Sequence, residues 1–124
     1  MASNAPSPLP RFVYKITPSA PPEPLPAVYP PSELDQNDGF VHLSTGPQIP
    51  ITAGLWFKDT AEFWIIKIRL AGARFEKDIN WDVPGCPHLY GNFGAEDVDS
   101  VRKFNREQGQ VWDQVLEPSV SWLE

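Results

Sequence analysis

The chain has 124 residues, 41% of them hydrophobic and 21% charged, and a formal net charge of −6 at pH 7. This length is that of one ordinary domain with a single hydrophobic core. The lysines and arginines are scattered and outnumbered by acids, which argues against a long nucleic-acid partner. No uncharged apolar run approaches the length of a membrane span.

Composition divides the chain into three regions. Residues 1–10 are rich in Ser, Ala and Pro and predict a flexible leader without the basic and apolar parts of a signal peptide. Residues 11–106 are the expected folded domain, and residues 107–124 a C-terminal extension packed on it. The single cysteine, Cys86, excludes an intramolecular disulfide and fits a reducing compartment, so we expect a cytoplasmic protein.

The first predicted element is a strand over residues 11–17, "RFVYKIT". Its alternation places Tyr14 and Ile16 on one face and Lys15 on the other. Twelve of the fifteen prolines precede residue 51, and residues 18–38 are especially rich in them. We therefore predict mainly loop over residues 18–38, either a lid or binding segment or an inserted surface loop.

A second strand is predicted in "GFVHLST", after the turn signal Asp38-Gly39. Alternation places Phe40, His42 and Ser44 on one face of this strand. A histidine inside an otherwise buried strand needs partners for both ring nitrogens, which indicates either a structural hydrogen-bond network or a site.

The rest of the chain predicts short elements with turns between them. These are a helix over 51–58 with Ile51, Leu55 and Trp56 on one stripe, strands over 62–70 and 98–105, and a short helix near Val111 that ends at Pro118. Residues 74–82 between the two strands predict either a further strand or an extended segment. Strands with one or two short helices and no strict βαβ alternation predict an α+β domain. Of the tryptophans, Trp56 and Trp64 are assigned to the core, and Trp112 and Trp122 to anchoring the C-terminal extension.

Several motifs in fixed order resemble a known family. These are "VYKIT" near the start, "DGFVHLST", a strand like "EFWIIKIRL", then "NWD" and "PHLYG", over roughly residues 12–102. In this order they resemble the uncharacterised family catalogued as domain of unknown function 952. Its members look like a reduced ADP-ribosyltransferase fold, a split mixed or antiparallel sheet whose cleft binds NAD in active enzymes.

The resemblance implies a small-molecule pocket, for NAD or a related nucleotide or sugar phosphate. It implies that His42, Ser44 and Thr45 line the cleft. Lys15 stands where active relatives of the wider fold often carry a histidine, and the catalytic glutamate of many transferases has no counterpart. A non-catalytic ligand-binding relative is therefore favoured over a standard transferase.

Residue chemistry completes the candidate site. His42 and His88 are the candidate catalytic residues, because imidazole can accept or donate a proton near neutral pH. The candidate ligand-binding residues are Lys15, Ser44, Thr45 and Tyr90, which offer one positive charge and three hydroxyls.

Three alternatives stay open. A metal site would combine the histidines with Asp35, Asp38 or Asp82, although no short His spacing supports it. Cys86 lacks an obvious activating group for a nucleophile. A structural or protein-interaction module would use the proline-rich loop and the tryptophan-bearing tail instead of a pocket.

Overall fold

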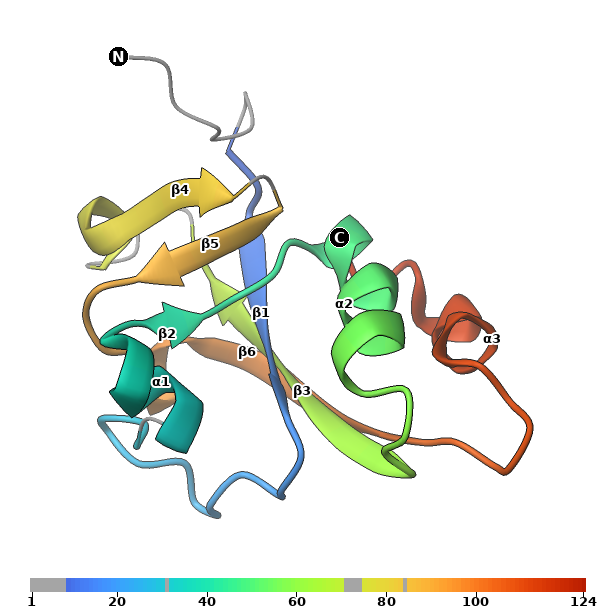
Figure 1. Ribbon diagram of the computed structural model, residues 1–124. Coiled ribbons are helices and arrows are strands. Elements are labelled where there is room, and N and C mark those ends of the chain that lie inside the picture. Colours follow the sequence, from blue (N-terminus) through green and yellow to red (C-terminus); the bar gives the residue numbers. More distant parts are fainter. Residues whose placement is uncertain (1–8, 31, 71–74, 84) are drawn as a thin grey trace.

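The computed structural model describes residues 9–30, 32–70, 75–83 and 85–124, with the side chain of Asp82 excepted. Most of the predicted leader, and the turn expected after the strand over residues 62–70, lie outside these residues. The described chain forms two three-stranded sheets, of order β1-β3-β6 and β2-β5-β4, with every strand pair antiparallel (Figure 1). The α+β prediction, with antiparallel sheets and few helices, is confirmed.

The first sheet consists of β1 (Phe12–Thr17), β3 (Glu62–Arg69) and β6 (Val98–Asn105). Its strands are rich in β-branched and aromatic residues and alternate between two apolar faces. One face contributes to the core that contains Tyr14, and the other to the core that contains Val13. The sheet is therefore the middle layer of the domain, and Tyr14 and Ile16 share one face of β1 as the period-two pattern of residues 11–17 predicts.

The second sheet consists of β2 (Val41–His42), β5 (Cys86–Leu89) and β4 (Ile79–Val83), and it covers the Val13 face. A pair of backbone hydrogen bonds joins it to the first sheet. The Tyr14 N–H donates to the Ser44 carbonyl and the Ser44 N–H to the Tyr14 carbonyl, both at 2.8 Å. The predicted strand over residues 39–45 is thus a two-residue strand followed by this bridge.

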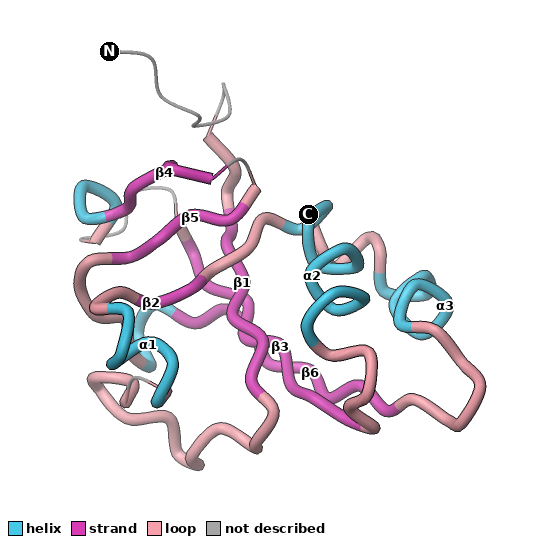
Figure 2. The backbone as a smooth tube through the Cα atoms, in the orientation of Figure 1, coloured by secondary structure: helices cyan, strands magenta, loops and turns pink. Residues whose placement is uncertain are grey.

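Helices α2 (Ile49–Trp56) and α3 (Trp112–Leu116) cover the opposite face of the first sheet, as Figure 2 shows. The described part of the chain has a third α-helix, α1 (Glu33–Asp38), where one or two helices were expected. Short 3-10 turns lie beside the main elements, at Gly46–Gln48, Glu76–Asp78, Ala95–Asp97 and Glu117–Ser119.

The core assignment of Trp56 is wrong, because 78% of this residue is exposed. Helix α2 begins at Ile49, two residues before the predicted start, and turns Ile49 and Ala53 toward the core. Residues two positions further on point about 200° away from these. Ile51 and Leu55 therefore face solvent, with 55% and 62% of their surface exposed.

Helix α1 (Glu33–Asp38) forms inside the segment predicted as loop. The Ser32 hydroxyl oxygen accepts a hydrogen bond from the Asp35 N–H at the start of the helix, and Gly39 ends it with a φ of 81°. Both are standard helix boundary signals. The prolines restrict this segment only up to the residue before Ser32, which leaves room for the short helix.

The proline-rich segment before α1 packs against the turn that precedes β6. Tyr29 stacks on Phe93 with ring centroids 4.9 Å apart, and its N–H donates to the Phe93 carbonyl at 2.7 Å. The Ala95 N–H donates to the Pro26 carbonyl at 2.9 Å. The segment is therefore fixed along the sheet by backbone and ring contacts.

The end of the chain is bound by a buried lysine of β3. Lys67 Nζ lies 2.8 Å from both the Trp122 carbonyl and Glu124 Oε2. The Tyr14 hydroxyl donates to the same Trp122 carbonyl at 3.0 Å. Trp112, Leu116 and Leu123 complete the core on this side. Residues after β6 thus supply part of the packing of the first sheet.

The packing of the chain end can be tested by substituting two glycines, of which only Gly46 lies against residues of that end. A Cβ at Gly46 would overlap the carbonyl oxygens of Leu123 and Glu124. We expect Gly46→Ala to lower the free energy of unfolding by about 1–3 kcal/mol, as overpacking usually does. Urea unfolding followed by circular dichroism measures this change.

Gly54→Ala is the matched control, since Gly54 lies within α2 and a Cβ there meets no atom within 4 Å. We expect this variant to gain roughly 0.5–1 kcal/mol from the better helix propensity of alanine. Equal stability of the two variants would show that the chain end does not pack against Gly46 in solution.

Candidate functional site

The pairing of β2 with β5 places His42 directly opposite His88. The two imidazoles meet edge to face with centroids 5.7 Å apart, and Phe40 stacks on His88 at 4.1 Å. Tyr90 completes the group, 5.2 Å from the Phe40 ring. We call Phe40, His42, His88 and Tyr90 the ring cluster. The two predicted catalytic histidines therefore lie together at one edge of the second sheet.

Asp35 of α1 holds His42 in place. Its Oδ1 accepts hydrogen bonds from His42 Nδ1 at 2.7 Å and from the His42 backbone N–H at 3.2 Å. Its Oδ2 lies 2.8 Å from Lys15 Nζ on β1. Oδ2 accepts no well-aligned hydrogen bond from any described residue, so its contact with Lys15 is an electrostatic attraction between opposite charges. One carboxylate thus connects three separate segments.

The ion pair between Lys15 and Asp35 is buried: the Lys15 side chain is 8% exposed and the Asp35 side chain 1% exposed. Burial by itself raises the pKa of Asp35, but the contacts with Lys15 and His42 outweigh it and hold the pKa below its ordinary value. Asp35 is therefore a carboxylate at neutral pH, and it compensates the charge of Lys15.

A second carboxylate approaches the other nitrogen of the same imidazole. Asp38 Oδ2 lies 3.0 Å from His42 Nε2. Both contacts are hydrogen bonds at once only when His42 carries a proton on each nitrogen, because carboxylates only accept. In that state His42 is a cation between two anions. The His42 side chain keeps 32% of its surface exposed, so water or a ligand can reach it.

The predicted ligand-binding residues fall into two groups. Lys15 and Tyr90 belong to the site, but Lys15 is paired with Asp35 and not presented to a ligand. Ser44 and Thr45 are buried at the junction between the sheets, where Thr45 also bonds the Gly85 carbonyl through its N–H. Among the described residues, neither of their side chains makes a hydrogen bond to the ring cluster.

Asp35 as the anchor of His42, and Phe40 as the central ring, were missed as site residues in the sequence. Asp35 was considered only as a metal ligand. The spacing Ser32-x-x-Asp35 is a helix-start signal, and it could have indicated α1. Nothing in the sequence indicates that α1 then turns Asp35 toward Lys15 and His42.

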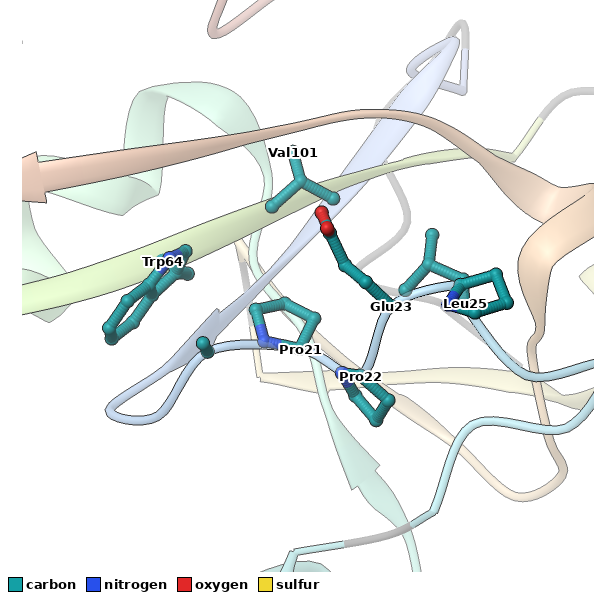
Figure 3. Close-up of a pocket in the computed structure, with 8 residues that line it drawn as sticks. Pro21, Pro22, Glu23, Leu25, Trp64 and Val101 are labelled. Atoms are coloured by element: carbon teal, nitrogen blue, oxygen red, sulfur yellow. The ribbon is translucent and has the colours of Figure 1, made fainter.

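Two hollows lie near these elements. The smaller, of about 210 Å³, is lined by Asp35 and Phe40 but by neither histidine. The larger, of about 760 Å³, lies between Trp64 and Val101 of the first sheet and the segment of residues 20–25 (Figure 3). Residues 20–25 of the proline-rich segment therefore border the larger hollow, and neither histidine lines that hollow. This position argues against a lid over the ring cluster.

The described residues do not favour the metal or cysteine alternatives. Within the described ranges, no three His, Cys, Asp or Glu side chains are grouped so that they could hold a metal ion. The side chain of Asp82 lies outside those ranges. Burial raises the pKa of the Cys86 thiol and outweighs the opposing effect of its hydrogen bond with Thr52. A protonated thiol is a poor nucleophile.

As for membranes, each helix in the described part of the chain is too short or too polar to pass through a bilayer.

The motif order of the sequence and this fold agree with the family comparison. Residues 24–101 match the family model described as "Protein of unknown function (DUF952)". This range is more than half of the chain and contains α1 and the whole ring cluster. The chain belongs to this family, as the resemblance implied. A search of curated proteins finds no match.

Solved structures of one bacterial protein share the fold. The crystal structure of protein CC0527 from Caulobacter crescentus aligns with a TM-score of 0.65 and 23% sequence identity, over 89% of this chain and 98% of that one. Its solution NMR structure aligns with a TM-score of 0.62 and 22% identity, over 82% of this chain and 91% of that one. At this identity the likeness shows the fold alone.

The buried carboxylate gives a pH-dependent prediction. We expect Asp35→Asn to lower the free energy of unfolding at pH 7 by about 3 kcal/mol, because Lys15 is left buried without a counter-charge. Since the pKa of Asp35 is lowered on folding, its carboxylate stabilises the fold above the unfolded-state pKa of about 4. This contribution is lost as the pH falls through the folded-state pKa, so the two proteins should converge in stability in acid.

Urea unfolding at a series of pH values measures this convergence. Glu33→Gln is the matched control, an exposed acid on the same helix, and it should change stability little at any pH. The double variant Lys15→Met/Asp35→Asn should lose less than the sum of the single losses. Wild type and Asp35→Asn curves that stay parallel in acid would contradict the ion pair.

Proposed function

We propose that the ring cluster and the Asp35-anchored His42 form a binding site for a small molecule, NAD or a related nucleotide or sugar phosphate. The single observation that carries this proposal is the hydrogen bond between the buried Asp35 carboxylate and Nδ1 of His42, which orients an imidazole that is partly exposed to solvent. A buried charge pair is costly to desolvate, and in this fold the Lys15–Asp35 pair holds the carboxylate that orients an imidazole. Here the oriented group is His42.

The ring cluster suits a planar ligand. Phe40 and Tyr90 are aromatic, both histidines add flat rings, and half of Tyr90 is exposed. Aromatic faces stack with nucleobases and similar rings regardless of their detailed chemistry. A nucleotide could therefore place its ring on this cluster and its phosphate or ribose near His42.

We also propose that the fold is a reduced version of the ADP-ribosyltransferase type. The support is the split arrangement of two three-stranded antiparallel sheets, with the "GFVHLST" and "PHLYG" motifs paired as β2 and β5. The missing transferase residues favour ligand binding over ADP-ribose transfer. His42 and His88 are the residues that we assign to proton transfer in any reaction of the bound ligand. A cytoplasmic location is proposed from the single, protonated cysteine.

The interaction-module alternative is weakened by the contacts of the tail. Trp122 donates its Nε1–H to the Ser100 hydroxyl at 2.9 Å, and the Arg102 guanidinium lies 4.7 Å from the centre of its ring. These contacts place the tail against the first sheet and occupy the tryptophan that would anchor a partner. Small-molecule binding at the ring cluster is therefore the better-supported function.

A ligand screen by thermal shift tests the site. We expect ADP-ribose or NAD to raise the melting temperature of the wild type, because a ligand at a hundred times its dissociation constant stabilises by about 2.7 kcal/mol. The shift should be lost in His42→Ala and in His88→Ala. Nicotinamide and simple sugar phosphates identify which part of the ligand is bound.

Trp56→Ala is the matched control, since it removes a largely exposed aromatic side chain from α2, outside the ring cluster. It should retain the full ligand shift. If no compound raises the melting temperature of the wild type and both histidine variants melt at a lower temperature, the histidines are structural and the proposed binding site is wrong.

A further inference from the structure

The two carboxylates that contact His42 differ in their access to water. The Asp35 side chain is 1% exposed, whereas the Asp38 side chain is 43% exposed. Asp35 also pairs with Lys15 and accepts the His42 backbone N–H, so it cannot leave without opening the fold. Asp38 makes its ion pair with His42 Nε2 at the surface, where such pairs are weak.

The charges around His42 show what the Asp38 contact does. The charges of Lys15 and Asp35 cancel each other, so when His42 carries a proton on each ring nitrogen its positive charge is balanced by Asp38. Should the Asp38 side chain rotate away, the site would present one positive charge and an N–H donor at Nε2. That combination binds an oxyanion, such as a phosphate or carboxylate. The His88 ring lies beside His42, and Tyr90 contacts Phe40 within the same ring cluster, so both are close to the position proposed for the anion.

We propose that Asp38 is an internal competitor for the ligand, occupying on His42 Nε2 the position that a ligand oxyanion takes. The inference rests on the proposed function and deepens it. The ligand then carries an oxyanion close to a planar group, with the oxyanion on His42 and the planar group on the ring cluster. Binding exchanges one carboxylate for another anion on the same nitrogen.

The position of Asp38 suits such an exchange. It is the last residue of α1, and Gly39 follows it in a left-handed conformation that ends the helix. Rotation of the Asp38 side chain therefore breaks a surface contact and leaves the backbone of α1 unchanged. The Ser32 cap and the Asp35 contacts lie earlier in the helix and stay in place.

The test is the affinity for inorganic phosphate and for ADP-ribose, measured from the NMR signals of the two imidazole rings. We expect Asp38→Ala to bind both probes roughly fivefold to tenfold more tightly than wild type, since a surface ion pair no longer has to be broken and one like charge is removed. Asp38→Asn, which keeps an acceptor for Nε2 but not the charge, should gain less. Glu33→Ala removes the same charge from the same helix and should gain little.

The double variant Asp38→Ala/His42→Gln shows whether the gain passes through His42, and it should bind no more tightly than His42→Gln alone. ADP-ribose binding of equal strength in wild type and Asp38→Ala would overturn the competitor role and leave the proposed function standing. A gain of equal size in Glu33→Ala would also overturn it, because the effect would then be general charge. No binding of either probe to any of these proteins would remove the site itself.

Discussion

The contact on which the rest of the site depends is the one between Asp35 and its two partners. A carboxylate removed from water is unfavourable by several kcal/mol unless positive charge and hydrogen bonds compensate it. Here β1 supplies Lys15 and β2 supplies both a backbone N–H and an imidazole. Three segments far apart in sequence must therefore meet at one point, and that meeting fixes the orientation of His42.

Backbone pairing between the strands, independently of the Asp35 side chain, also brings these segments together. Reciprocal hydrogen bonds between Tyr14 and Ser44 align β1 with the strand that carries His42. The register of β2 with β5 then places His88 beside His42, and a shift of one residue between these strands would leave the two rings on opposite faces of the sheet. The ring cluster is thus a product of register, and the Asp35 contacts select one orientation within it.

Local patterns in the sequence predicted the faces of the strands well. Alternation placed Tyr14 and Lys15 on opposite faces, and it placed Phe40 and His42 on the same one. It could not place Asp35, because the approach of α1 to β1 depends on tertiary packing that no periodicity encodes. The stripe of α2 was misplaced for a related reason: tertiary packing turns Ile49 and Ala53 toward the core, which leaves Ile51 and Leu55 exposed. The helical period does not explain the exposure of Trp56, the last residue of α2.

The sequence left two alternatives for the proline-rich segment, and the structure argues against a lid over the ring cluster, since residues 20–25 border a hollow that neither histidine lines. Prolines restrict the unfolded chain, so ordering a segment that contains many of them loses less entropy. The segment is further tied down by the Tyr29 contacts with Phe93 and by the Ala95 hydrogen bond to Pro26. These contacts restrict where the chain can begin α1 after Ser32. The prolines therefore reduce the entropy lost when α1 brings Asp35 to Lys15 and His42, even though none of them lies in the ring cluster.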